Sequence, residues 1–236
     1  MLKNLYNILV SFVIGTLLLT VIILLVGCGG GGSGPGAGMP IIGAPIQLPV
    51  TDPSTSTPET NPENCTVALW GDSVMYGGYE LVKRLSSPPA MTLKTLRPQY
   101  TVTDHSQNGA SAFYFLPIFL SAEHEEDVVV IQYGINDAGH NFPYETSMRS
   151  MIERAQAMKK IVMITGISQG GIPNREPYNA IAERLAVEYG VYFADWGSVE
   201  FHDGDVPDGV HPNQEYSTRL IARLTEILDL AKPECA

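Results

Sequence analysis

Short apolar segments alternate with segments of helical periodicity from residue 65 to the C-terminus. The apolar segments are rich in Val, Ile, Tyr and Thr, as strands are, and lie at residues 65–70, 100–105, 127–133, 160–165 and 191–195. Apolar positions that recur at three- and four-residue steps predict helices near residues 78–86, 112–122, 144–158, 175–189 and 213–231. This alternation predicts an α/β domain over residues 65–236, with a parallel sheet of about five strands between two layers of helices. The strands are almost continuously apolar, which agrees with a sheet buried on both faces.

The N-terminus has a different pattern. Lys3 precedes a nearly unbroken apolar run over residues 8–26, and the sequence LVGC follows at its end, closing with Cys28. A basic start, an apolar segment and small residues at a cleavage point are typical of an export signal. The LVGC segment resembles the lipobox of bacterial lipoproteins, which implies cleavage before Cys28 and a diacylglyceryl group on its sulfur. We therefore expect residues 1–27 to be a lipoprotein signal peptide. An uncleaved membrane anchor is the alternative, since about 20 apolar residues can span a bilayer.

Both alternatives place the rest of the chain outside the cytoplasm, at the cell envelope and facing the periplasm or the exterior. Residues 28–64 begin with glycine-rich sequence and end with sequence rich in Pro, Thr and Ser, which is typical of a flexible or extended linker. We expect this linker to hold the domain off a membrane.

Cys65 and Cys235 stand at the two edges of the predicted domain. In an oxidising compartment such a pair can form a disulfide, whose long loop would stabilise the fold by about 4–5 kcal/mol through chain entropy. Two unpaired thiols are the alternative.

Composition and spacing exclude several classes of function. Apolar residues make up 44% and charged residues 17% of the 236 positions, which fits a globular domain with a substantial core. The net charge of −11 and the lack of a basic stripe argue against nucleic-acid binding. The sequence has no H-x-x-x-H or C-x-x-C spacing and no glycine-rich phosphate loop, so we expect no metal site and no cofactor. His124 lies in an acidic run and is expected at a solvated helix end.

Candidate chemistry lies in loops at the ends of the predicted strands, because active residues of parallel sheets gather beyond the carboxyl ends. Three such loops, and a fourth before the last helix, are distinctive. They are Gly71-Asp72-Ser73, Gln107-Asn108-Gly109-Ala110, Gly134-Ile135-Asn136-Asp137 and Asp208-Gly209-Val210-His211-Pro212. Each alone is a modest signal, since Asn-Gly is usually a turn and Asn or Asp often caps a helix.

Three of these residues have the chemistry of a nucleophilic hydrolase. Ser73 would attack a carbonyl carbon while His211 takes the hydroxyl proton. Asp208, three residues before the histidine, would orient the imidazole and set its tautomer. Asp72 and Asp137 are expected to brace their loops by hydrogen bonds rather than to react.

In this order the four motifs resemble the sequence blocks of the SGNH (GDSL-type) hydrolases, over roughly Thr66 to Leu230. The resemblance implies a three-layer α/β/α sandwich with a flavodoxin-like sheet, and a serine ester hydrolase. It also implies three oxyanion donors, namely the backbone N–H of Ser73, the backbone N–H of Gly109 and the side-chain amide of Asn136. Val74 departs from the usual Leu or Ile, and the second block is recognisable mainly by Gly109.

A second serine competes for the role of nucleophile. Ser168 stands in TGISQGG after an apolar run, a match to the G-x-S-x-G nucleophile elbow. An elbow must be followed at once by a helix, whereas Gly170, Gly171 and Pro173 disfavour one here. Choosing Ser168 would also leave the first three motifs without a role. We therefore expect this segment to be a loop after the fourth strand, on the substrate side.

The sequence thus predicts an envelope-anchored serine hydrolase that cleaves carboxylic acyl or acetyl esters through an acyl-enzyme. O-acetylated glycans, lysophospholipids and small acyl or aryl esters are the candidate substrates. Aromatic residues near the site would line it or pack against the sheet instead; they are Phe113, Tyr114, Phe115, Tyr76 and Tyr79. The alternative function is a non-catalytic surface lipoprotein that binds a glycan or a protein on the same scaffold. The presence of all the expected site residues favours the enzyme.

Overall fold

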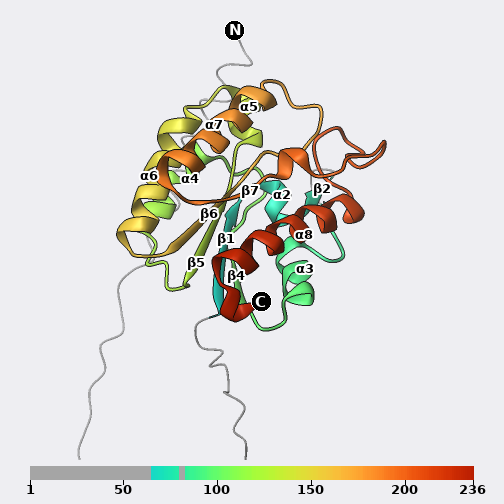
Figure 1. Cartoon of the computed structure of the whole chain (residues 1–236). Helices are drawn as coiled ribbons and strands as arrows, with labels where there is room; N and C mark the ends of the chain where they lie inside the picture. The colour runs from blue at the N-terminus through green and yellow to red at the C-terminus, as the bar shows by residue number, and fades with distance from the viewer. Residues whose placement is uncertain (1–64, 80–82) are drawn as a thin grey trace, which may run out of the picture. The chain divides into compact units, whose positions relative to one another are not determined.

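The computed structural model describes residues 65–79 and 83–236 (Figure 1). The predicted signal peptide at residues 1–27, the lipidation of Cys28 and the linker at 28–64 lie outside these residues. Within the described part of the chain, no helix combines the length and the apolar character that crossing a membrane requires.

Five parallel strands form the central sheet in the order β4-β1-β5-β6-β7. Their bounds are β1 Thr66–Gly71, β4 Thr101–Asp104, β5 Val128–Gln132, β6 Ile161–Thr165 and β7 Tyr192–Ala194. The strand β4 pairs with one edge of β1, and β5, β6 and β7 follow in turn on the other edge of β1. This is the flavodoxin-like order. Val67 of β1 lies opposite Val102 of β4 and Val128 of β5, so β-branched residues are neighbours across the sheet. The predicted fold class and the predicted strands are confirmed.

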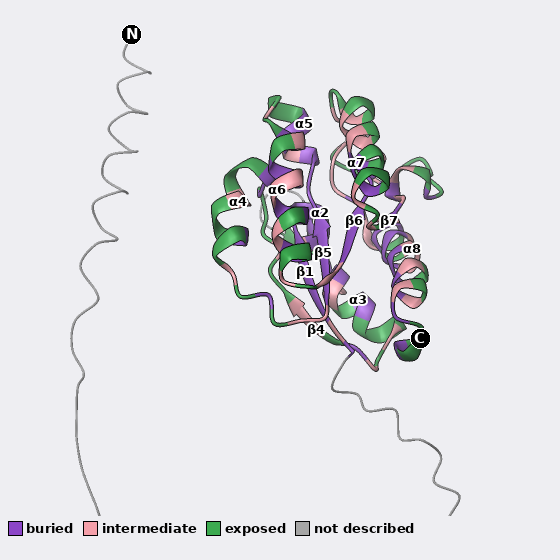
Figure 2. Cartoon of the chain, turned by 60° about the vertical axis from the view of Figure 1, so that its left-hand side comes forward, coloured by how far each residue is buried: buried purple, intermediate pink, exposed green. Residues whose placement is uncertain are grey.

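Helices cover both faces of this sheet. One layer contains α2 (Ser73–Tyr76), α3 (Pro89–Leu96) and α8 (Gln214–Ala231), and the other contains α4 (Ala112–Ser121), α6 (Tyr144–Ala157) and α7 (Arg175–Tyr189). Alternate residues of β1 divide between two cores. Val67 and Leu69 pack in the core with α8, whereas Ala68 and Trp70 pack in the core with α4 and α6. Figure 2 shows the central strands β1, β5 and β6 buried between helices whose outer faces are exposed. The three-layer α/β/α sandwich is therefore confirmed.

The predicted helix near residues 78–86 is wrong. The chain forms the short helix α2 and then an antiparallel pair, β2 (Gly78–Tyr79) and β3 (Lys83–Arg84). Gly77 ends α2 in a left-handed conformation with φ 74°, which glycine adopts at little cost. The next helix, α3, starts at Pro89, because the fixed φ of proline suits the first helical position. The four other predicted helices are confirmed, and their ends shift by at most one residue.

His124 is buried, so the expectation that it is solvated is wrong. Its ring packs against Trp70 and Phe119, and its Nε2 lies 2.9 Å from the carbonyl oxygen of Phe119. Burial lowers the pKa of His124, which favours the neutral imidazole in this core.

A disulfide joins Cys65, just before β1, to Cys235 near the C-terminus. The two Cα atoms are 5.8 Å apart across a sequence separation of 170 residues. This bond lies at the amino ends of the strands, whereas the motif-bearing loops follow the carboxyl ends (Figure 1). Both ends of the described domain are therefore held at the edge of the sheet opposite those loops.

Candidate active site

The turn after β1 places Ser73 at the start of α2. Gly71 has no room for a side chain, since an added Cβ would lie 2.5 Å from the Cβ of Met75. Asp72 caps the helix, and its Oδ1 accepts a hydrogen bond from the Val74 N–H at 2.9 Å. Ser73 is 3% exposed and occupies the first helical position, where a backbone N–H has no partner within the helix. The GDS motif thus holds a buried hydroxyl at the carboxyl edge of the sheet.

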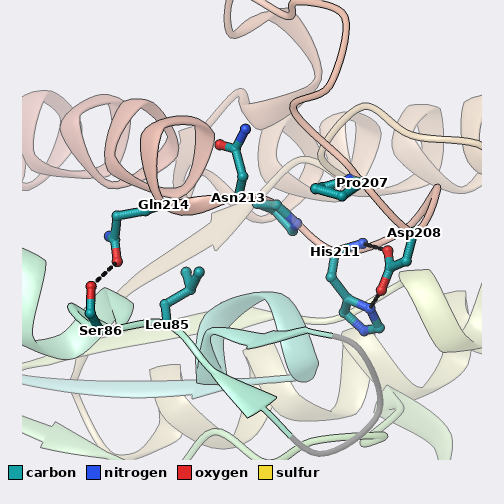
Figure 3. Close-up of a pocket in the computed structure, with 8 residues that line it drawn as sticks. Leu85, Ser86, Pro207, Asp208, His211, Asn213 and Gln214 are labelled. Carbon is teal, nitrogen blue, oxygen red and sulfur yellow. Dashed lines mark hydrogen bonds and ion pairs between the residues drawn. The ribbon is translucent and has the colours of Figure 1, made fainter.

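The loop before α8 brings a histidine and a carboxylate to this serine. The Nε2 atom of His211 lies 2.9 Å from Ser73 Oγ, although the two residues are 138 positions apart. The Nδ1 atom of His211 lies 2.7 Å from Asp208 Oδ2 (Figure 3). Asp208 Oδ1 accepts from the backbone N–H groups of His211 at 2.7 Å and Val210 at 2.9 Å. The structure therefore brings three predicted site residues together as one hydrogen-bonded chain, Asp208–His211–Ser73.

The surroundings of Asp208 keep its carboxyl group ionised. Burial alone would raise the pKa of Asp208, but hydrogen bonds from the backbone and ring of His211 and from Val210 outweigh burial and hold that pKa well below its ordinary value. The carboxylate can then accept the Nδ1–H of His211. In that tautomer the lone pair of Nε2 faces the hydroxyl of Ser73.

The two other motifs lie at the carboxyl ends of the strands that flank β1. Gly109 follows β4 with φ 75°, a conformation that favours glycine, and nothing lies within 4 Å of the position that a Cβ would occupy. Asn136 lies in the first turn of α5 (Ile135–His140), and its Nδ2 donates to the Ala110 carbonyl at 2.6 Å. This bond ties Asn136 to the loop of Gly109, on the side of the site where α4 and α5 begin.

Gln132 is a site residue that the sequence predictions missed. Its side chain is 1% exposed at the end of β5, and its Oε1 accepts from the backbone N–H groups of Asp72 and Met75, at 3.2 Å each. The amide thereby fixes the turn that carries Ser73 against the neighbouring strand. The available signal is a polar residue that ends the otherwise apolar strand VVVIQ, because a buried polar group needs a hydrogen-bond partner.

Two buried carboxyl groups brace the site. Asp137 accepts from the N–H groups of Ala112 at 3.0 Å and Phe113 at 3.2 Å, which holds the start of α4 against α5. Burial raises the pKa of Asp137, and it raises the pKa of Asp72 to about 7. Asp72 Oδ2 has no hydrogen-bond partner among the described residues. The bracing role predicted for both aspartates is confirmed by these bonds and by the cap on α2.

Ser168 lies in a loop that supports the histidine loop. It is 1% exposed, and the next helix after it, α7, begins only beyond this loop. The Gly171 N–H donates to the Gly209 carbonyl at 2.7 Å, and a Cβ added at Gly170 would lie 3.2 Å from the same oxygen. The two glycines therefore allow the loops to pack closely. Contact of this segment with substrate stays a prediction.

The aromatic residues named from the sequence divide between surface and core. Phe113 and Tyr114 are 41% and 63% exposed, and their rings contact that of Phe142. Phe115 is less exposed and faces the buried ring of Tyr133. Across residues 65–79 and 83–236, no group of three or more His, Cys, Asp or Glu side chains is placed to hold a metal ion.

Comparisons with known proteins agree with this geometry. A model of the GDSL-like lipase/acylhydrolase family matches residues 69–217, a range that includes all four motifs. A solved carbohydrate acetylesterase family member from Sinorhizobium meliloti is 17% identical, covers 70% of this chain and 98% of its own, and has a TM-score of 0.59. The inhibitor-bound aryl esterase of M. smegmatis is also 17% identical, with coverage of 70% and 98% and a TM-score of 0.58. At such identities the likeness shows the fold. A comparison with curated proteins found no match.

Proposed function

This chain belongs to the GDSL-like lipase/acylhydrolase family, and we propose that it cleaves carboxylic esters through an acyl-enzyme formed on Ser73. Membership of the family makes it a carboxylic ester hydrolase. One observation supports the mechanism above all: His211 lies 2.9 Å from Ser73 Oγ and 2.7 Å from Asp208. A nucleophile, a base and a group that orients the base are the parts that acyl transfer requires.

In the proposed mechanism, Ser73 attacks the ester carbonyl carbon while its hydroxyl proton passes to His211 Nε2. The resulting imidazolium keeps its Nδ1–H on Asp208, whose negative charge stabilises it. His211 then gives the proton to the oxygen of the leaving alcohol, and the acyl group stays on Ser73. A water molecule that loses a proton to His211 next attacks the acyl-enzyme. The acid leaves, and the serine hydroxyl is restored.

Three groups at the carboxyl edge of the sheet serve as donors to the oxyanion. The Ser73 N–H lies at the start of α2, and the Gly109 N–H lies in an open loop. Asn136 has a second Nδ2 hydrogen besides the one donated to Ala110. Removal of one such donor typically lowers kcat by about 10²–10³-fold. An uncharged amide suits position 136, because a carboxylate there would repel the oxyanion.

The expected substrates are O-acetylated glycans, lysophospholipids or small acyl esters at the cell envelope. A solved structure of similar fold belongs to a carbohydrate acetylesterase family, which supports an acetyl ester as one candidate. Anchoring through a lipid on Cys28, or through an uncleaved N-terminal helix, would keep the enzyme at the envelope. Labelling with [³H]palmitate tests the lipid. Label that disappears in Cys28→Ser supports lipidation, and an unlabelled parent contradicts it.

Two serine variants of the full chain test the proposed nucleophile, with p-nitrophenyl acetate as the substrate. Ser73→Ala should lower kcat by about 10³-fold or more, as loss of a triad nucleophile does. Ser168→Ala is the matched control, because this serine is also buried just beyond the carboxyl end of a strand, and it should retain activity. Equal activity of Ser73→Ala and the parent would contradict the mechanism. A parent that hydrolyses no ester in a panel of acyl lengths and acetylated sugars would favour the non-catalytic binding protein.

A further inference from the structure

A cavity of about 310 Å³ lies beside His211, between the residues that follow β3 and the loop before α8. Leu85, Pro207 and Pro212 are its apolar lining residues, and the triad residues Asp208 and His211 also line it. Figure 3 shows the Leu85 side chain pointing toward the loop that carries the histidine. The cavity therefore lies directly beside His211, the proposed base.

The amide side chains that line the cavity already have protein partners. Gln214 Oε1 accepts from the Ser87 N–H at 3.0 Å, and its Nε2 donates to the Ser87 carbonyl at 2.9 Å. Asn213 Oδ1 accepts from the Tyr216 N–H at 2.8 Å, and its Nδ2 donates to the Gly204 carbonyl at 3.0 Å. These bonds hold the rim together and leave the interior mainly apolar. No Lys or Arg is among the residues that line the cavity. Such a site favours an uncharged, apolar group over a phosphodiester or a sugar with several hydroxyls.

The position of the cavity indicates which half of an ester it holds. The oxyanion donors proposed above, Gly109 and Asn136, lie on the side of the site where α4 and α5 begin, so the carbonyl oxygen points to that side. His211 and the cavity lie on the side of α8. The leaving oxygen must come within hydrogen-bond reach of His211 Nε2 to receive its proton. The alcohol portion thus departs toward the cavity.

We propose that this cavity is the alcohol subsite of the enzyme and that Leu85 limits the size of the alcohol. The assignment rests on the proposed function of Ser73. Among the substrates proposed above, it favours small acyl esters of apolar alcohols over the esters of glycans and lysophospholipids. A water molecule occupies about 30 Å³, so about 310 Å³ accommodates roughly ten non-hydrogen atoms. Butyl and benzyl groups fit within this volume.

Two ester series test the proposal on the full chain. In the first, acetate is constant and the alcohol grows from methyl to butyl, which changes the intrinsic reactivity of the ester little. In the second, methanol is constant and the acyl group grows from acetyl to pentanoyl. In the parent, kcat/KM should rise by up to about fourfold for each methylene added to the alcohol, from the burial of apolar surface. Leu85→Trp should lower the butyl-to-methyl ratio of the alcohol series by about tenfold and leave the ratio of the acyl series unchanged.

Leu96→Trp is the matched control, because Leu96 is 36% exposed on α3 and lies outside the cavity lining. Both ratios should stay at their parental values in this variant. Leu85→Ala widens the cavity and should shift the highest kcat/KM toward esters of benzyl and larger alcohols. This second variant tests the proposal even if Leu85→Trp does not fold. Benzyl alcohol should inhibit the parent competitively, and it should inhibit Leu85→Trp more weakly, with a higher inhibition constant.

The possible failures are distinguishable. If the parent hydrolyses these esters through Ser73, but Leu85→Trp leaves the alcohol series unchanged or compresses the acyl series instead, the cavity assignment is wrong and the proposed mechanism stands. If the parent cleaves p-nitrophenyl acetate or an acetylated sugar through Ser73 but none of these alkyl esters, the alcohol subsite alone is overturned. If it cleaves no ester at all, the proposed function and the alcohol subsite are both overturned.

Discussion

The substitution Asp72→Asn removes a buried ionisable group next to the nucleophile and preserves its shape. Asp72 is fully buried, and one carboxyl oxygen accepts from the Val74 N–H at 2.9 Å. The amide oxygen of asparagine can accept the same bond, so the cap on α2 is retained. The variant therefore isolates the cost of burying a charge at this position.

The magnitude follows from the pKa of Asp72, which burial raises from 3.8 to about 7. Because the folded pKa is the higher one, the folded protein binds more protons than the unfolded chain between these values. The free energy of unfolding therefore falls as pH rises from about 4 to about 7. At about 1.36 kcal/mol for each pKa unit, the whole effect is about 4 kcal/mol, of which about 2–3 kcal/mol falls between pH 5 and pH 8.

Urea denaturation at several pH values between 5 and 8 measures this effect. The free energy of unfolding of Asp72→Asn, minus that of the parent, should increase by about 2–3 kcal/mol from pH 5 to pH 8. Taking the difference cancels the titration of the shared groups that do not interact with Asp72. Asp203→Asn, at an exposed position, is the control and should show no such trend. A difference for Asp72→Asn that does not depend on pH would refute the reasoning.

Three further predictions concern the disulfide, the histidine loop and the oxyanion donors. Replacing Cys65 and Cys235 together by serine should lower the free energy of unfolding by about 5 kcal/mol, from the entropy of a loop that spans 170 residues; a loss under about 1 kcal/mol by urea denaturation would contradict this. Gly209→Ala and Gly204→Ala place a Cβ in open space at φ 84° and 87°, and each should cost about 1–2 kcal/mol of stability. Only Gly209→Ala should also lower kcat, by about tenfold, because Gly209 lies between Asp208 and His211 of the triad. If the two variants have the same kcat, the geometry of this loop does not limit the reaction. Asn136→Ala should lower kcat about 10²–10³-fold with little change in KM, whereas an unchanged kcat would exclude this amide from the oxyanion site.

The sheet was predictable because both of its faces are buried. The central strands are then apolar along most of their length, as in VVVIQ of β5, and the intervening helices show clear periodicity. The segment after Ser73 was not predictable in this way. Gly77 ends α2 just before the helix predicted near residues 78–86, and Pro89 begins α3 just after it. The pair of β2 and β3 lies in the predicted range instead. Glycine and proline at these positions were the local signals that outweighed the periodicity.

The part of the site that directly follows the strands was predictable from the sequence. Ser73, Gly109 and Asn136 follow three adjacent strands, and their common edge follows from the parallel topology. The contact of His211 with Ser73 joins residues 138 positions apart, and it was expected from their chemistry and from the resemblance of the four motifs to a family, not from periodicity. Gln132 and the cavity at Leu85 depend on how side chains pack between elements, which periodicity does not report.

Covalent trapping of the nucleophile tests the central claim most directly. The full chain is treated with diisopropyl fluorophosphate, which forms a stable ester with an activated serine, and the adduct is located by peptide mass spectrometry. The account predicts one adduct on Ser73, which is lost in Ser73→Ala, retained in Ser168→Ala and formed much more slowly in His211→Ala. An adduct on Ser168, or labelling of Ser73→Ala at the rate of the parent, would contradict it.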